Sequence, residues 1–354
     1  MVLSKKTLLE KLKKAMPGIE SGKVVLQGAD SFVFENGCIY SYNDSIAVMI
    51  PFGESAEMKG AVKAKELYQT ISKLPQDEIN VAVNDKSWLM KCGKAKAEFT
   101  LQNFDYKSRL EGITPDDNWI DLDDSFITAL GVCKMASNKT ALSGIYFEGK
   151  TVLSTDGFQI NQFTFDKLDF PKFWISDNSA SELLKFSTFK QLQVNGNWVH
   201  FKFEDGTVFS VKTLMVDKFP ASKINTVMDT NKENDNSFHA TFPKALFPAI
   251  DRAVEFGIDI EGHNSVRLQI DPKCIEVSAE RSSGRYDEKV QWDTEMNEFE
   301  PLTVYVDSDM MQFMSKRTLD FYILYRKTKK GAEEPTLLFV SSNSRHLMTT
   351  FNKG

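Results

Sequence analysis

The chain has 354 residues, of which 42% are hydrophobic and 26% are charged, and its formal net charge is -6. This composition excludes a disordered or fibrous protein, and the length is enough for two or three domains of roughly 100 to 200 residues each. No stretch approaches the roughly 18 apolar residues of a membrane span, and the N-terminus lacks the apolar core of a signal peptide, so we expect a cytoplasmic protein.

Charge and cysteine content narrow the possible classes of protein further. A net charge of -6 argues against a surface that is basic everywhere, but not against nucleic-acid binding, because positive charge can gather on one face. The cysteines lie far apart, without a Cys-x-x-Cys pair, at Cys38, Cys92, Cys133 and Cys274. This spacing favours free thiols over a zinc site or a disulfide framework.

The first third of the chain alternates helices with groups of strands. Leu8, Leu9 and Leu12 fall at helical spacing behind Ser4, a favourable N-cap, and predict a helix over residues 4–16. A second helix is predicted over residues 59–74. Asn36-Gly37 predicts a hairpin turn between two strands. Strands are predicted over residues 24–26, 31–34, 38–42, 79–83, 87–91 and 95–101.

The same order of helix, strands, helix, strands recurs twice. The second cycle predicts helices over 121–135 and 178–186, and strands over 142–147, 151–154, 159–165, 191–194, 198–203 and 207–213. The third cycle predicts helices over 242–256 and 307–316, and strands over 266–270, 274–279, 288–292, 320–326, 336–341 and 346–351. A cycle that recurs roughly every 115 residues indicates three structural repeats.

Polar, turn-rich segments over residues 112–118 and 229–237 separate the cycles. We therefore predict three domains, which cover residues 1–117, 118–232 and 233–354. Strands joined by hairpins, and not by long crossover helices, indicate antiparallel sheets. The predicted class is α+β, with two helices packed on antiparallel sheets in each repeat.

Basic residues gather on the predicted helices, above all in the first repeat. Because the apolar faces of these helices pack on a sheet, the lysines must face outward together. Such a face is either a solvated surface or, if the faces converge in space, a site for phosphates. The candidate DNA-binding residues are Lys5, Lys6, Lys11, Lys13, Lys14, Lys23, Lys59, Lys63, Lys65, Lys73, Lys134, Lys139, Lys185, Arg252, Lys316 and Arg317.

The sequence contains little that indicates catalysis, metal binding or cofactor binding. The four histidines, His200, His239, His263 and His346, occur in no His-x-x-x-His or Gly-x-Ser-x-Gly setting. Asp307 is better explained as the cap of the helix that follows it than as a metal ligand. We therefore predict no enzymatic activity, no cofactor and no metal site.

The segment over residues 140–165 resembles the second-domain signature of the bacterial sliding clamp, the beta subunit of DNA polymerase III. Leu142-Ser-Gly144 and Ser154-Thr-Asp-Gly157 fit the family pattern, whereas Phe158-Gln159-Ile160 replaces His-Arg-Leu. Phe219-Pro220 resembles the family's crossing from the second to the third domain, and residues 345–351 resemble its last strand. The departures indicate a distant member, and a phage origin is one interpretation.

The resemblance implies a head-to-tail ring, most simply a homodimer, with helices around a hole for duplex DNA. It implies a DNA polymerase and a clamp loader as partners. The subunit interface would include Phe99, Leu101 and Phe256. A pocket for a partner peptide would use Leu142, Thr155, Gly157, Phe158, Ile160, Pro220, Ile224, Met314, Val340, Leu347 and Met348.

Three alternatives stay open at this point. A monomeric processivity or single-strand-binding factor would keep a basic face without closing into a ring. A scaffold or adaptor of phage origin would have no role on DNA. A hydrolase with an unrecognised site is the third alternative, and the small number of histidines disfavours it.

Overall fold

The computed structural model describes residues 1–20, 22, 26–53, 57–137, 142–186, 189–230, 238–260, 263–297, 299–327 and 333–349. The chain divides into two compact units. Unit 1 contains Met1–Ile127 and Phe173–Val216, and unit 2 contains Thr128–Lys172 and Asp217–Gly354. The middle repeat contributes to both units, and the three domain boundaries stay a prediction.

Unit 1 begins with a four-stranded antiparallel sheet in the order β1 (Val2–Ser4), β6 (Glu78–Val83), β7 (Ser87–Cys92) and β8 (Ala95–Thr100). Helix α1 (Lys5–Ala15) starts where predicted, because the Ser4 hydroxyl accepts the Thr7 N–H at 3.2 Å. Its buried face, which includes Leu8 and Leu12, packs beside α2 (Ala64–Ser72).

The second sheet of unit 1 has eight strands and joins distant parts of the chain. Four come from the first repeat: β5 (Gly60–Lys63), β2 (Ser31–Glu35), β3 (Cys38–Tyr42) and β4 (Ile46–Pro51). The order continues with β16 (Val208–Lys212), β15 (Trp198–Phe203), β14 (Phe189–Asn195) and β9 (Ile120–Asp121). The two halves meet where β4 pairs antiparallel with β16. Unit 1 also contains two short α-helices, α3 (Tyr106–Glu111) and α5 (Asp177–Leu183).

Unit 2 repeats this plan with a second eight-stranded sheet. Its order begins with β13 (Phe170–Ile175), which starts in unit 2 and ends in unit 1, and continues with β10 (Ile145–Gly149), β11 (Thr151–Thr155) and β12 (Gln159–Thr164). It continues with β25 (Ser344–Thr349), β24 (Glu333–Val340), β23 (Asp320–Lys327) and β17 (Phe238–Thr241). Here the halves meet where β12 pairs antiparallel with β25. Helix α4 (Asp124–Lys134) begins in unit 1 and ends in unit 2.

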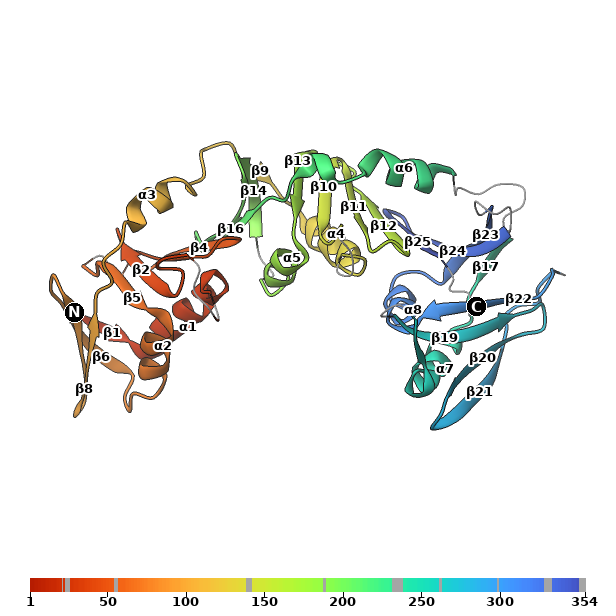
Figure 1. Ribbon diagram of the computed structural model, residues 1–354, viewed down its shortest axis with the longest axis horizontal. Helices are drawn as coiled ribbons and strands as arrows, with labels where there is room; N and C mark the ends of the chain where they lie inside the picture. The colour runs from red at the N-terminus through yellow and green to blue at the C-terminus, as the bar shows by residue number, and fades with distance from the viewer. Residues whose placement is uncertain are drawn as a thin grey trace. The chain divides into compact units, whose positions relative to one another are not determined.

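The last sheet of unit 2 is antiparallel and contains β18 (Ile258–Ile260), β19 (His263–Ile270), β20 (Cys274–Arg281), β21 (Gly284–Gln291) and β22 (Leu302–Asp307). Helices α7 (Leu246–Ala253) and α8 (Ser308–Ser315) lie against each other and against this sheet (Figure 1). As predicted, Asp307 caps α8, since its carboxylate accepts the Met310 N–H at 2.9 Å.

The structure confirms the α+β class, the main helices and most predicted strands. The Asn36-Gly37 hairpin is also confirmed, because both residues have positive φ, 50° and 71°, as this type of turn requires. The four cysteines are free thiols, as predicted. No described helix is long and apolar enough to cross a membrane, and no group of three metal-binding side chains gathers among the described residues.

Several sequence predictions were wrong in detail. The helix predicted over residues 59–74 begins only at Ala64, because Gly60–Lys63 pairs with β2 as a strand. The predictions also did not include α3 or α6 (Ala221–Thr230), nor β1, β4, β5, β9, β13, β17, β18 and β22. Most of the strand predicted over residues 24–26 lies outside the described residues.

Candidate functional site

The lysines of α1 differ in their surroundings. Lys6 and Lys13 are exposed, and among the described residues neither forms an ion pair. Lys5 instead points towards the end of α2, where its ammonium group donates to the carbonyl oxygen of Leu74 at 2.6 Å. A cation suits this position just beyond α2, because the C-terminal end of a helix carries partial negative charge.

Lys14 connects α1 to the turn between β15 and β16. Its Nζ donates to Asp205 at 2.7 Å and to the Thr207 hydroxyl at 3.0 Å, and it lies 5.0 Å from the centre of the Phe203 ring. Lys11 lies 4.0 Å from the same carboxylate. Burial favours a higher pKa for Asp205, but hydrogen bonds from Lys14 and Thr207 outweigh it and lower the pKa to about 2. Lys14 is therefore engaged within unit 1.

The basic residues near α2 show the same division. Lys63 forms an ion pair with Asp30. Lys59, Lys65 and Lys73 are exposed, and no described carboxylate pairs with them. Lys59, Lys65 and Lys73 therefore face solvent, whereas Lys63 at the N-cap of the helix is neutralised by Asp30.

Two predicted contacts in the later repeats are already paired with acids. Lys185 donates to Glu182 at 2.6 Å, one turn earlier in the chain. Arg252 of α7 makes a two-pronged contact with Glu288 of β21, with N–O distances of 2.7 Å, and these hydrogen bonds raise the pKa of Arg252 while lowering that of Glu288. Both cations would have to leave a carboxylate to bind a phosphate.

The cations that follow α8 are less constrained. Lys316 is exposed. Arg317 lies 3.5 Å from the centre of the Phe313 ring, and burial lowers its pKa.

The remaining predicted DNA contacts add little. Lys134 is the last residue of α4, and Lys23 and Lys139 lie outside the described residues.

Eight predicted DNA contacts thus have no carboxylate partner among the described residues, and we call them the open cations. They are Lys5, Lys6, Lys13, Lys59, Lys65, Lys73, Lys316 and Arg317.

A second feature, in unit 2, is an apolar row that crosses four strands. Ile160 of β12 is directly opposite Leu347 of β25, which is opposite Leu338 of β24, which is opposite Tyr322 of β23. Met228 of α6 is fully buried against this row. We call these four strand residues, with the α6 residue that covers them, the apolar seam.

The structure brings only some predicted pocket residues to the apolar seam. Ile160, Val340 and Leu347 belong to its cluster. Met314 and Met348 belong instead to the large core cluster of the third repeat. Met348 follows Leu347 in β25, and neighbouring residues of a strand face opposite sides of the sheet.

The other predicted pocket residues hold the turn after β11 and the start of α6. The Thr155 hydroxyl donates to the carbonyl of Gln159 at 2.7 Å and accepts the Gly157 N–H at 3.1 Å. The Pro220 carbonyl accepts the Ile224 N–H at 3.0 Å, and Ile224 is buried on α6. Leu142 and Phe158 are half-buried.

Sequence reasoning missed the polar contacts that hold α6 in place. Arg345 of β25 donates to the Gln162 side chain at 2.9 Å and to the carbonyl of Met228 at 3.3 Å. Gln162 in turn donates to Asn225 of α6 at 3.1 Å. Ile224 and Met228, four residues apart, are a helical signal that could have revealed α6.

The predicted interface residues lie at two sheet edges. β8, which contains Phe99, is the last strand of its sheet, and β21 is the last strand of another. A Cβ atom at Gly284, where β21 begins, would lie 2.9 Å from the Phe256 ring, so this ring packs on β21. Leu101 lies against Gly60, because a Cβ atom there would come within 2.9 Å of Leu101.

Two histidines, His200 of β15 and His346 of β25, are buried. His200 contacts the Ser210 hydroxyl at 2.7 Å, and burial lowers its pKa to about 4. His346 contacts Asn161, and burial lowers its pKa to about 3. Both rings are therefore neutral near pH 7.

Taken together, the elements define an α+β protein of tandem repeats whose neighbouring halves share continuous sheets. Solved structures with this architecture include DNA polymerase III beta subunits, or sliding clamps. The match to the Bacillus subtilis sliding clamp has a TM-score of 0.78 at 17% identity and covers 100% of this chain and 99% of that one. The Helicobacter pylori beta clamp bound to a DNA ligase peptide matches with a TM-score of 0.78 at 15% identity, and 99% of each chain is covered.

The Pseudomonas aeruginosa beta subunit matches with a TM-score of 0.77 at 15% identity, again over 99% of each chain. The sequence matches no protein-family model, and a sequence comparison with curated proteins finds no significant match. The chain therefore has the sliding-clamp fold over its full length, and the resemblance seen in the sequence is confirmed for the fold.

Proposed function

We propose that this protein is a DNA sliding clamp, a non-catalytic subunit that closes into a ring with a second copy, encircles duplex DNA and tethers a polymerase. The observation that carries the proposal is the match to sliding clamps over 99% or more of the chain.

The open cations support binding to the DNA backbone. Ammonium and guanidinium groups without acidic partners can meet phosphates at no loss of an existing ion pair. Contacts of this kind read no base sequence, so they permit sliding. The ion pairs of Lys14, Lys63, Lys185 and Arg252 assign these four residues a smaller part in DNA binding.

The two edge strands support the ring. An edge strand presents unpaired backbone groups, which another strand can complete by forming an antiparallel ladder. We propose that β8 of one copy pairs with β21 of the next, with Phe99 and Phe256 beside the joint. Because this contact joins two different surfaces, it must close on itself to give a ring and not a filament.

The apolar seam supports the tethering of partners. Apolar anchors of a short peptide bind best where a hydrophobic surface is flanked by a few polar groups. The half-buried Ile160, Val340 and Tyr322 offer such a surface next to Arg345. A polymerase and a clamp loader are the partners that we propose for this surface.

A loader-free threading experiment tests the proposal. The protein is mixed with linear duplex DNA that carries biotin at both ends, and streptavidin is then added to block the ends. A ring that has threaded onto the DNA stays bound in high salt and leaves when a restriction enzyme cuts the duplex. Binding that salt abolishes would indicate a monomeric DNA-binding factor, and no binding at all would favour the adaptor alternative.

A further inference from the structure

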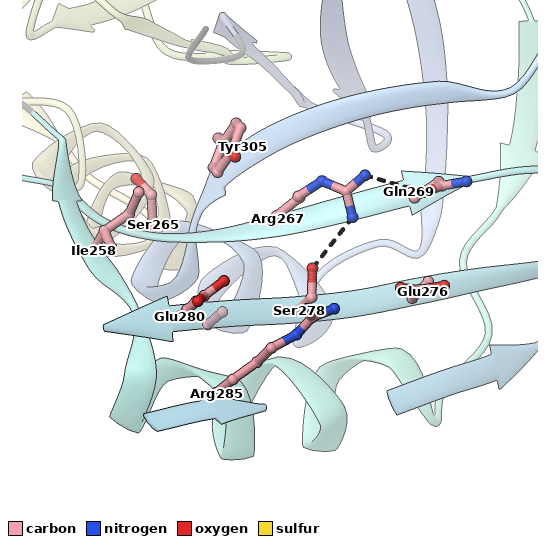
Figure 2. Close-up of a pocket in the computed structure, with 10 residues that line it drawn as sticks. Ile258, Ser265, Arg267, Gln269, Glu276, Ser278, Glu280, Arg285 and Tyr305 are labelled. Atoms are coloured by element: carbon pink, nitrogen blue, oxygen red, sulfur yellow. Dashed lines mark hydrogen bonds between the residues drawn. The ribbon is translucent and has the colours of Figure 1, made fainter. Parts of the chain in front are cut away.

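The solvent face of the last sheet contains a polar hollow of about 420 Å³. Val266, Leu268 and Val277 face the helices of unit 2 and are buried, so the alternate residues of the same strands face away from them. These residues include Arg267 of β19 and Ser278 of β20, which Figure 2 shows side by side in the hollow, with Tyr305 of β22 nearby.

Arg267 at the centre of the hollow has only neutral partners among the described residues. Its guanidinium donates to the Gln269 side chain at 3.0 Å, to the Ser278 hydroxyl at 3.3 Å and to the Thr303 hydroxyl at 3.4 Å. A half-buried guanidinium is usually matched to a carboxylate or a phosphate, because two parallel N–H donors fit two oxygens. Asp287, which is opposite Ser278 on the next strand, acts on Arg267 through its charge but not through a hydrogen bond among the described contacts. The donors of Arg267 therefore meet only neutral groups, and an anionic group could replace them.

Two glutamates flank Arg267 symmetrically. Arg267 is directly opposite Ser278, and Glu276 and Glu280 lie two residues to either side of that serine on β20 (Figure 2). Diagonal neighbours of this kind are about 7 to 8 Å apart. The face therefore presents charges in the order minus, plus, minus along the strand direction.

The surrounding cations leave this pattern in place. Lys289 lies 3.9 Å from Glu276, at the limit of an ion pair and in an exposed position. A third carboxylate on this face, Asp287 of β21, is opposite Ser278, but Arg285 donates to it at 2.7 Å and largely neutralises it. Two carboxylates so close to Arg267 disfavour a multiply charged phosphate and favour a single carboxylate with positive charge on both sides.

We infer that this face binds an extended segment of a partner protein in which an acidic residue alternates with two basic ones, in the order basic, any, acidic, any, basic. Alternate side chains of an extended chain point the same way and are about 7 Å apart, which matches the spacing of the three charges on the sheet. The acidic side chain would meet Arg267, and the basic side chains would meet Glu276 and Glu280.

The test uses defined peptides and the full chain. The probes are acetylated, amidated Lys-Thr-Glu-Thr-Lys, its isomer Lys-Lys-Thr-Thr-Glu, and Lys-Thr-Gln-Thr-Lys, titrated against protein with nitrogen-15 labelled arginines and followed by NMR. We expect the first peptide to shift the Arg267 side-chain signal and to bind about fivefold to tenfold more tightly than the other two.

Matched variants separate this site from general charge effects. Arg267→Gln should weaken the first peptide about tenfold, whereas Arg285→Gln, which removes the same charge from the same face, should leave its affinity within about twofold because Asp287 already occupies that arginine. Arg267→Lys keeps the positive charge but loses the two parallel N–H donors. The affinity of this variant for the first peptide should lie between those of the two glutamine variants. Equal binding of the isomer, equal loss in both glutamine variants, or no binding to the wild-type protein would overturn the inference, whatever the outcome of the DNA-threading experiment.

Discussion

Neighbouring lysines of one helix can have different roles, and Lys13 and Lys14 illustrate this. In the sequence they are equivalent members of a basic helix. In the structure, Lys13 is exposed, whereas Lys14 is held by Asp205, Thr207 and Phe203 from a segment about 190 residues later. The sequence could predict that α1 is basic, but not which cation would meet an acid brought in by folding.

Replacing each lysine should therefore change a different property. Lys14→Met should lower the free energy of unfolding by about 1 kcal/mol, a modest value because Asp205 is 45% exposed and water screens the pair. Lys13→Met should leave stability unchanged and reduce the slope of log DNA affinity against log salt by about 1. Chemical denaturation and DNA titrations at several salt concentrations measure both quantities. A loss of stability in Lys13→Met, or a reduced salt slope with unchanged stability in Lys14→Met, would contradict these roles.

The two buried histidines predict a dependence of stability on pH. The pKa of His346 is lowered from 6.5 to about 3, so the unfolded chain binds a proton there more readily than the folded chain does. Stability is then full above pH 6.5 and is lost as the pH falls towards 3. Between pH 6.5 and 4.5, His346→Leu should lose less stability than the wild type, as measured by urea unfolding. Identical slopes of the unfolding free energy against pH in the two proteins would contradict this role of His346.

At the level of elements, local signals were reliable and long-range pairings were not. Helix caps such as Ser4 and Asp307, and the Asn36-Gly37 turn, act within a few residues, so the sequence reveals them. β4 pairs with β16 from a distant part of the chain, and such a partner leaves no local pattern.

The candidate peptide surface shows the same limit. The strands that carry Ile160, Val340 and Leu347 could be predicted from the sequence, and the resemblance to sliding clamps selected these residues. Met228 and Arg345 were missed, because their importance depends on α6 lying across β25. For the same reason the sequence could not separate Leu347, at the apolar seam, from Met348, in the core.

Burial of Met228 contributes to holding helix α6 on the sheet, so removal of this side chain is costly. Met228→Ala should destabilise the protein by about 2 to 4 kcal/mol, because the side chain is fully buried against Leu324, Leu338 and Leu347. Met215→Ala is the control, since that methionine is 68% exposed, and it should change stability by less than about 0.5 kcal/mol. Comparable losses in the two variants would show that α6 does not depend on this contact.

For the whole molecule, a net charge of -6 is compatible with DNA binding only if the open cations lie on one surface and the acids lie elsewhere. A ring satisfies this requirement when the helices of all repeats line its hole. This is the arrangement that we propose, with the edge strands β8 and β21 closing the ring.

Electron microscopy of the purified protein, together with its mass in solution, tests this central claim most directly. We predict a closed particle of two copies with a central opening wide enough for a double helix, and with the open cations around that opening. A solid particle, or a single copy that stays unclosed at the concentrations where it supports DNA retention, would contradict it.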